Sequence, residues 1–157
     1  MGKGFTEPDP RDDLSGADVA RKVLILARES GLMLEPADVK LEGLLPADFD
    51  SSGPLDDFLR RLPQLDEPFR RRIAALKAEG KVLRYAGSVG PEGARTGLLE
   101  AGPEHPLFGI QGGENALSFL TAHYSPRPMV IRGYGAGAAV TAAGVLSDVL
   151  RLALGLR

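Results

Sequence analysis

The sequence predicts an α+β protein in which helices pack on one mostly antiparallel or mixed sheet. Helical and strand-like periodicities occur in the same chain, but they alternate too irregularly for a complete doubly wound fold. Residues 90–93 form a Gly-Pro-Glu-Gly turn between two strand-like segments, as in an antiparallel hairpin. With 157 residues, of which 43% are hydrophobic, the chain is long enough for one main domain with its own core.

The first predicted helix follows a proline-rich segment. Residues 1–14 are dense in Gly, Pro and Asp, and Pro8 and Pro10 predict a stiff extended loop because each disfavours a helical predecessor. Ser15 is a candidate N-cap, with Asp18 at the third helical position. Gly31 is a suitable residue to end the helix. Apolar residues at helical spacing lie between them, at Val19, Val23 and Leu26.

A short strand over residues 39–45 and a short helix over residues 55–62 are expected next. A second helix should follow Pro63 and end near Gly80. Its polar side includes the run Arg70, Arg71 and Arg72, most simply the solvent-exposed face of an amphipathic helix. Its predicted apolar face consists of Leu65, Phe69, Ile73 and Leu76.

The period then changes to two, which predicts strands over residues 81–87 and 96–100 on either side of the turn. Two further strands are predicted over residues 116–124 and 129–133, separated by a turn with two prolines. The last predicted element is a helix over residues 138–154. Its candidate buried positions are Val140, Ala143, Leu146 and Leu150.

Composition excludes several classes of function. A formal net charge of −2 provides no positive field for nucleic acid or an anionic membrane. No apolar run reaches the length of a membrane-spanning helix, and the N-terminus lacks a signal-peptide core. The chain has no cysteine, which suits a reducing cytoplasm. Neither His105 nor His123 completes a metal or triad pattern, so no metal site is expected.

Residues 7–22 combine closely spaced acids and bases around the start of the first helix. Asp18 and Lys22 are four residues apart, which is the spacing of an exposed ion pair of small energetic value. The alternative is that Lys22 is a proton donor held by Asp18, with Glu7 and Asp13 binding a cationic group on a substrate.

The glycine pattern at residues 133–138 stands between a predicted strand and a predicted helix and formally matches dinucleotide-binding sites. Such a fingerprint should open a βαβ unit with an acid about 20 residues later, and the printed sequence ends at Arg157. The pattern therefore does not begin a nucleotide domain here. A tight strand-to-helix turn with small residues for close packing is the alternative.

Several segments resemble homoserine dehydrogenases in the same order along the chain. They are residues 6–16, 18–22, 80–85, 113–116, 132–137 and 140–145. The resemblance spans nearly the whole chain and is greatest to the C-terminal part of a bifunctional aspartokinase–homoserine dehydrogenase, a monofunctional enzyme being the alternative. Phe5 stands where the family commonly has tyrosine.

The resemblance implies an oxidoreductase of threonine and methionine biosynthesis that interconverts L-aspartate 4-semialdehyde and L-homoserine. It implies that Lys22 and Asp18 are catalytic, that Glu7 and Asp13 bind the amino-acid substrate, and that Gly137 contacts the cofactor. The cofactor, NADP or NAD, would be bound mainly by an N-terminal domain that precedes these residues in the family.

Under this resemblance, residues 1–133 form an N-terminally truncated substrate-binding and catalytic domain. Residues 134–157 are the glycine turn and C-terminal helix that return to the nucleotide-binding half. A homodimer through the sheet is expected, and the fragment by itself should be inactive. The alternative function is a non-catalytic dimerisation or ligand-sensing α+β module.

Overall fold

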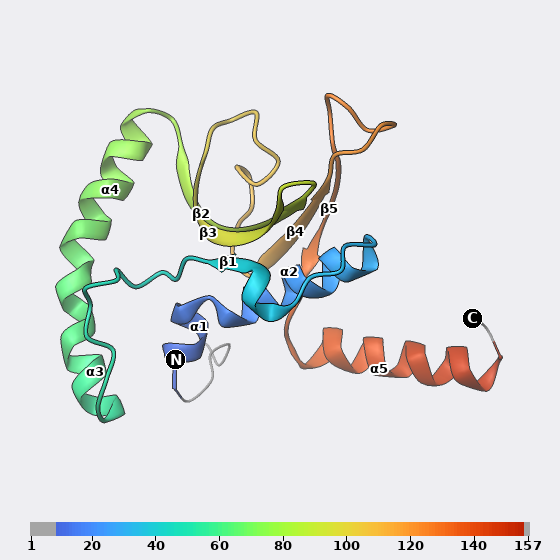
Figure 1. Cartoon of the computed structure of the whole chain (residues 1–157), viewed down its shortest axis with the longest axis horizontal. Coiled ribbons are helices and arrows are strands. Elements are labelled where there is room, and N and C mark those ends of the chain that lie inside the picture. The colour runs from blue at the N-terminus through green and yellow to red at the C-terminus, as the bar shows by residue number, and fades with distance from the viewer. Residues whose placement is uncertain (1–8, 156–157) are drawn as a thin grey trace. The chain divides into compact units, whose positions relative to one another are not determined.

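The structure is a computed structural model that describes residues 9–155, and it confirms the α+β class (Figure 1). The chain divides into two compact units, Met1–Pro103 and Glu104–Arg157. The elements of the first unit are α1 (Arg11–Ser15), α2 (Ala17–Glu29), η1 (Pro36–Asp38), β1 (Val39–Leu41), α3 (Leu55–Arg61), η2 (Leu62–Leu65), α4 (Asp66–Ala78), β2 (Val82–Gly90) and β3 (Gly93–Ala101). The elements of the second unit are β4 (Glu114–Phe119), β5 (Met129–Tyr134) and α5 (Ala138–Ala153).

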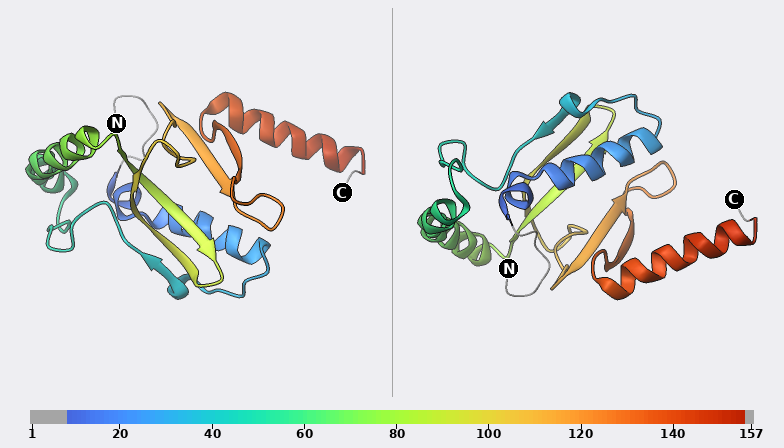
Figure 2. Two further views of the ribbon diagram at one scale, coloured as in Figure 1. Left: turned by 90° about the horizontal axis from the view of Figure 1, so that it is seen from above. Right: turned by 90° about the horizontal axis from the view of Figure 1, so that it is seen from below.

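The first unit contains a three-stranded mixed sheet with the order β1-β3-β2. Strands β2 and β3 form the predicted antiparallel hairpin, in register from Val82 opposite Ala101 to Gly90 opposite Gly93. Strand β1 pairs in parallel with β3 on the other edge. Both strands of the hairpin are longer than predicted because pairing continues to the two residues of the turn itself. Helix α2 lies across one face of this sheet (Figures 1 and 2).

The core of the first unit lies between α2 and the sheet. Val23 and Leu24 of α2 pack with Val39 of β1 and Ala94 of β3, and all four are buried. Burial of a side chain of this size stabilises the fold by about 1.5–3 kcal/mol. Gly87 of β2 allows the helix to come close, since a Cβ there would lie 2.1 Å from a methyl group of Val23. Of the predicted apolar stripe, Val23 is buried and Val19 packs partly buried against this core, whereas the buried Leu24 and Ala27 were not predicted.

The segment before α2 differs from the extended loop predicted for it. Residues Arg11–Ser15 form the short helix α1, and Pro10 stands at its N-cap position. Proline restrains φ to a helical value, which favours the start of a helix as well as ending one. The predicted N-cap Ser15 belongs to α1, and Gly16 is the N-cap of α2. The Ser15 hydroxyl nevertheless accepts the N–H of Ala17, at 3.2 Å.

Helix α4 contacts β2 and is largely solvent-exposed, whereas α3 is mostly half-buried. Phe58 of α3 is completely buried and Leu76 of α4 is 5% exposed, whereas Ile73 is 51% exposed. The apolar face predicted for α4 is therefore only partly buried within this chain. Strand β1 covers three residues rather than the seven predicted, because the chain turns away from the sheet after pairing once more through the Glu42 N–H and the Thr96 carbonyl.

The second unit is a hairpin followed by a long helix. Strands β4 and β5 pair antiparallel, from Glu114 opposite Tyr134 to Phe119 opposite Met129. The described strands thus form two sheets, not the one sheet that was predicted. Strand β4 ends at Phe119 rather than 124, because the Thr121 hydroxyl accepts backbone N–H groups and forms a local turn.

Helix α5 has the predicted extent, but the prediction of its buried positions was wrong for this chain. Val140, Leu146 and Leu150 are 43%, 58% and 51% exposed, and Ala143 is exposed too. Helical periodicity identifies a face that can be buried, and no described element covers this one. Among residues 9–155, no helix combines the length and the apolar character needed to cross a membrane.

Candidate functional site

Asp18 and Lys22 lie one turn apart on α2 and form an ion pair. The Lys22 Nζ is 2.7 Å from Oδ2 of Asp18, and the Lys22 side chain is 65% exposed. Arg21 lies 3.8 Å from the other carboxylate oxygen of Asp18. The spacing predicted from the sequence is therefore confirmed as a contact. An exposed ion pair of this kind contributes little to the stability of the fold, so its main effect is to orient the Lys22 side chain.

The start of α2 is fixed by a close contact at Gly16. This residue is buried and has a φ of +80°, and a Cβ on it would lie 1.8 Å from the hydroxyl oxygen of Tyr85. The Tyr85 hydroxyl donates to the carbonyl oxygen of Glu42, at 2.6 Å, and lies 3.2 Å from the hydroxyl of the buried Thr96. Tyr85 thereby joins both strands of the hairpin to the junction of α1 and α2.

A second contact holds the same junction from the loop after β1. The Leu44 N–H donates to the carbonyl oxygen of Leu14, at 2.9 Å. Gly43 approaches the same turn so closely that a Cβ would lie 2.9 Å from the Ser15 carbonyl oxygen. The start of α2, whose first turn carries Asp18, is thus held by the Tyr85 side chain of β2 and by backbone contacts with the loop after β1.

Four residues in and before α1 and α2 were predicted to form the site, namely Glu7, Asp13, Asp18 and Lys22. Asp13 is exposed near the end of α1, and no hydrogen bond or ion pair joins its side chain to Asp18 or Lys22 in the part of the chain described. Glu7 lies outside the described residues. The structure therefore brings Asp18 and Lys22 together and leaves the substrate-binding roles of Glu7 and Asp13 as predictions.

Sequence reasoning missed Asp9 and Arg11 as a structural pair. The Arg11 Nε donates to both carboxylate oxygens of Asp9, at 3.0 and 2.9 Å, and the Arg11 backbone N–H donates to Oδ1. Hydrogen bonds from Arg11 hold the pKa of Asp9 below its usual value, because they favour the charged carboxylate. The available signal was the spacing of Asp9 and Arg11 on either side of Pro10, but this segment was predicted to be an extended loop.

The glycine turn between β5 and α5 is a strand-to-helix turn, as the packing interpretation predicted. Gly137 is the N-cap of α5 with a φ of +118°, and no atom lies within 4 Å of the position that its Cβ would take. At Gly135, by contrast, a Cβ would lie 1.9 Å from Nδ2 of Asn115. Gly135 therefore serves packing inside the unit, whereas Gly137 leaves open space beside its backbone.

One ion pair holds the ends of the β4–β5 hairpin together. Arg132 donates to Oε2 of Glu114, at 2.7 Å, and to the Gly109 carbonyl oxygen. The backbone N–H of Gln111 and the Arg132 side chain lower the pKa of Glu114. Sequence reasoning missed this pair, because its members are 18 residues apart and meet only through the strand register.

The arginine run of α4 and His105 make local contacts. The arginine run of α4 pairs with carboxylates, Arg70 and Arg71 with Glu67 and Arg72 with Glu100. His105 Nδ1 accepts the backbone N–H of Leu107 in a local turn. Within residues 9–155, no group of three or more His, Asp or Glu side chains could hold a metal ion.

The fold is that of a dehydrogenase domain. It superposes on the homoserine dehydrogenase of S. aureus with a TM-score of 0.65 and 26% identity, covering 98% of this chain and 34% of that one. A sequence model of the homoserine dehydrogenase family matches residues 1–150, so the chain belongs to this family.

Two relatives show how the chain relates to longer proteins. It is 56% identical to the bifunctional aspartokinase/homoserine dehydrogenase of Haemophilus influenzae, over 95% of this chain and 18% of that protein. It is 43% identical to the homoserine dehydrogenase of Paracoccidioides brasiliensis, over 95% of this chain and 41% of that protein. The chain thus spans less than half the length of either relative.

Proposed function

We propose that this chain is the substrate-binding and catalytic part of a homoserine dehydrogenase that interconverts L-aspartate 4-semialdehyde and L-homoserine. The bifunctional relatives support a parent that also carries an aspartokinase. A cytoplasmic location belongs to the same proposal and is supported by the cysteine-free composition. The observation that carries the proposal is the Asp18–Lys22 pair on a helix whose first turn is held on two sides.

Lys22 is the proton donor in the direction of reduction. As a hydride reaches the aldehyde carbon, the carbonyl oxygen gains an electron pair and takes a proton from the Lys22 ammonium, which leaves homoserine and a neutral amine. In the reverse direction the amine accepts the hydroxyl proton. A positioned acid or base of this kind contributes roughly 10²–10⁴-fold to the rate. Asp18 holds the ammonium in place through its ion pair with Lys22.

Glu7 and Asp13 bind the ammonium group of the amino-acid substrate. Both lie in the segment that leads into α2, and carboxylates complement a cationic group. The exposure of Asp13 leaves its carboxylate free for a ligand. A homodimer through the sheet is part of the same proposal, since oligomers commonly pair identical surfaces.

The cofactor, NADP or NAD, supplies the hydride when it is bound. Gly137 fits a contact with it, because the space beside its backbone is open and a backbone without Cβ permits close approach. We assign residues 1–133 to the substrate-binding domain and residues 134–157 to the nucleotide-binding half, which carries most of the cofactor site.

Replacement of Lys22 in the full-length enzyme tests the proposal. Lys22→Ala should lower the rate of NADPH consumption with aspartate semialdehyde by about 100-fold or more, because the proton donor is lost. Lys77→Ala is the matched control, since Lys77 is an exposed lysine in the last turn of α4. Parental turnover by a folded Lys22→Ala enzyme would contradict the proposal and favour a non-catalytic dimerisation or ligand-sensing module.

A further inference from the structure

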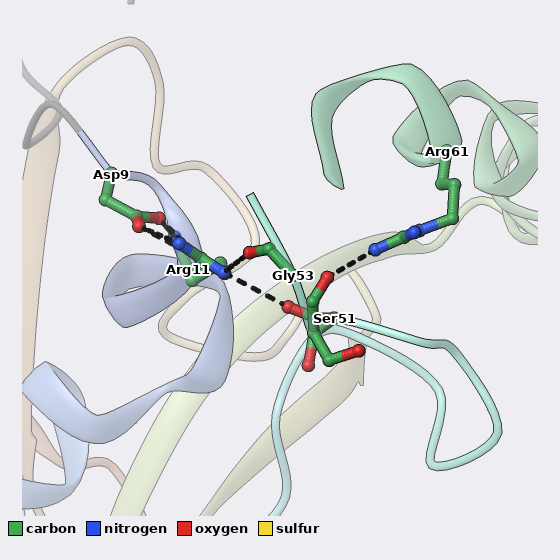
Figure 3. A network of polar contacts seen from close by, with 6 residues as sticks. Asp9, Arg11, Ser51, Gly53 and Arg61 are labelled. Carbon is green, nitrogen blue, oxygen red and sulfur yellow. Dashed lines mark hydrogen bonds and ion pairs between the residues drawn. The ribbon is translucent and has the colours of Figure 1, made fainter. Parts of the chain in front are cut away.

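Arg11 connects the start of α1 to a loop about forty residues later in the sequence. Besides its contacts with Asp9, its Nη1 donates to the carbonyl oxygen of Gly53, at 2.9 Å, and to that of Ser51, at 3.4 Å (Figure 3). All three nitrogens of the guanidinium group therefore donate to protein oxygens, Nη2 donating to Asp9. A side chain engaged in this way supports the backbone around it rather than binding a ligand.

The same guanidinium group lies over the ring of Phe58, which packs against Phe49. The Arg11 Cζ lies 5.7 Å from the centroid of the Phe58 ring, and Phe58 is completely buried. Phe49, which stands in the loop before Ser51, packs edge-on against Phe58 at 6.0 Å. A planar guanidinium can stack on an aromatic face while it donates in its own plane, which an ammonium cannot do.

A second arginine holds the loop from the side of α3. Arg61 donates to the carbonyl oxygen of Ser52 in the loop (Figure 3). Its Nη1 lies 3.6 Å from a carboxylate oxygen of Asp50. Three successive carbonyl groups, those of residues 51–53, thus accept from Arg11 or Arg61. The loop is a fixed support, and Arg11 attaches the start of α1 to it.

We propose that Arg11 is a positioning residue for substrate binding. This inference rests on the proposed function, in which Glu7 and Asp13 bind the substrate ammonium group. Arg11 stands between them in sequence, two residues before Asp13. By fixing the start of α1 against residues 51–53 and Phe58, Arg11 sets the position of the Asp13 carboxylate on the same short helix. A shift of about 1 Å in such a group can cost up to about 100-fold in rate.

The test compares Michaelis constants in the full-length enzyme. Arg11→Ala should raise the KM for aspartate semialdehyde roughly 10- to 100-fold and leave the KM for NADPH within about twofold. Arg11→Lys should remain impaired, because lysine keeps the charge but lacks the planar fork. Arg60→Ala is the matched control: Arg60 is exposed and pairs with Asp57 on α3. Its two KM values should equal those of the parent.

The outcomes separate positioning from stability. A merely structural role would reduce the amount of folded enzyme, which lowers kcat and moves neither KM. Parental KM values for the semialdehyde in both Arg11 variants, or equal increases for both substrates, would overturn the inference. If Arg11→Ala does not fold, Arg11→Lys decides by the same comparison. Lys22→Ala is measured in parallel to distinguish the two proposals. If Lys22→Ala is inactive and the Arg11 variants keep the parental KM values, only the positioning role of Arg11 is refuted.

Discussion

Gly16 is the residue at which the backbone of the candidate site is most constrained. It combines a φ of +80° with direct contact with the Tyr85 hydroxyl. The sequence predicted a helix start within one residue of this position, from the cap-forming residues and the apolar spacing. The reason for a glycine there could not be predicted, because it depends on a tyrosine 69 positions later that only the folded sheet brings into contact.

Gly16→Ala should lower the free energy of unfolding by roughly 2–5 kcal/mol, because it adds left-handed strain and a clash with Tyr85. Gly31→Ala is the matched control. Gly31 has a φ of +88° with no atom near its Cβ position, so its replacement should cost only the backbone strain, about 1–2 kcal/mol. Denaturant unfolding of both variants measures the difference. Equal losses of unfolding free energy in Gly16→Ala and Gly31→Ala would show that the contact with Tyr85 does not constrain the junction of α1 and α2.

The Asp9–Arg11 pair predicts a pH dependence. Hydrogen bonds from Arg11 lower the pKa of the Asp9 carboxyl in the folded state below its ordinary value of 3.8. Its contribution to stability is therefore present above about pH 3.9, the unfolded value, and is lost as the pH falls through the lower folded pKa. Carbon-13 NMR should show the Asp9 midpoint below 3.8 in the parent and close to that value in Arg11→Ala.

Glu114 is the internal control for this titration. Its pKa is lowered by Gln111 and Arg132, which belong to the other compact unit. Its midpoint should be the same in the parent and in Arg11→Ala. An Asp9 midpoint that does not rise in Arg11→Ala would contradict the assigned cause of the shift.

The position of helix α2 depends on its close approach to strand β2 at Gly87. Period and capping signals predicted α2, the hairpin and α5, because these depend on local sequence. The same signals missed α1 and did not predict the division of the strands into two sheets. A five-residue helix is too short for a periodic pattern, and sheet membership depends on pairing between distant segments.

Gly87→Ala should push α2 away from the sheet and cost about 1–3 kcal/mol, because the new methyl group meets Val23. Gly90→Ala on the same strand is the control, since no atom lies within 4 Å of its Cβ position. Its effect should stay within about 0.5 kcal/mol. Thermal unfolding of both variants measures the contrast. A Gly87→Ala protein as stable as Gly90→Ala would show that the helix does not rest on the strand at this point.

For the whole molecule, the apolar residues of α5 remain exposed within residues 9–155. Val145, Val149 and Leu152 are 60%, 55% and 82% exposed. The sequence alone correctly predicted a helix here, but its predicted buried positions are exposed, because periodicity does not encode which partner covers a face. The proposal assigns this helix to the nucleotide-binding half.

Under the proposed function, which places most of the cofactor site outside this chain, the chain by itself should show little or no NADPH consumption with aspartate semialdehyde. An absorbance assay with excess chain, at about 340 nm in the nicotinamide band, measures NADPH consumption. A full-length enzyme of the family is the positive control. Turnover by the isolated chain near that of the intact enzyme would refute this part of the proposal.

In the proposed reaction, Lys22 transfers the proton to the carbonyl oxygen while hydride moves to the aldehyde carbon. Single-turnover decay of NADPH absorbance, at saturating aspartate semialdehyde in the full-length enzyme, tests it most directly. The account predicts that Lys22→Ala slows this step by roughly 10²–10⁴-fold while the substrate dissociation constant stays near that of the parent. Parental decay, or a loss explained entirely by weaker substrate binding, would contradict it.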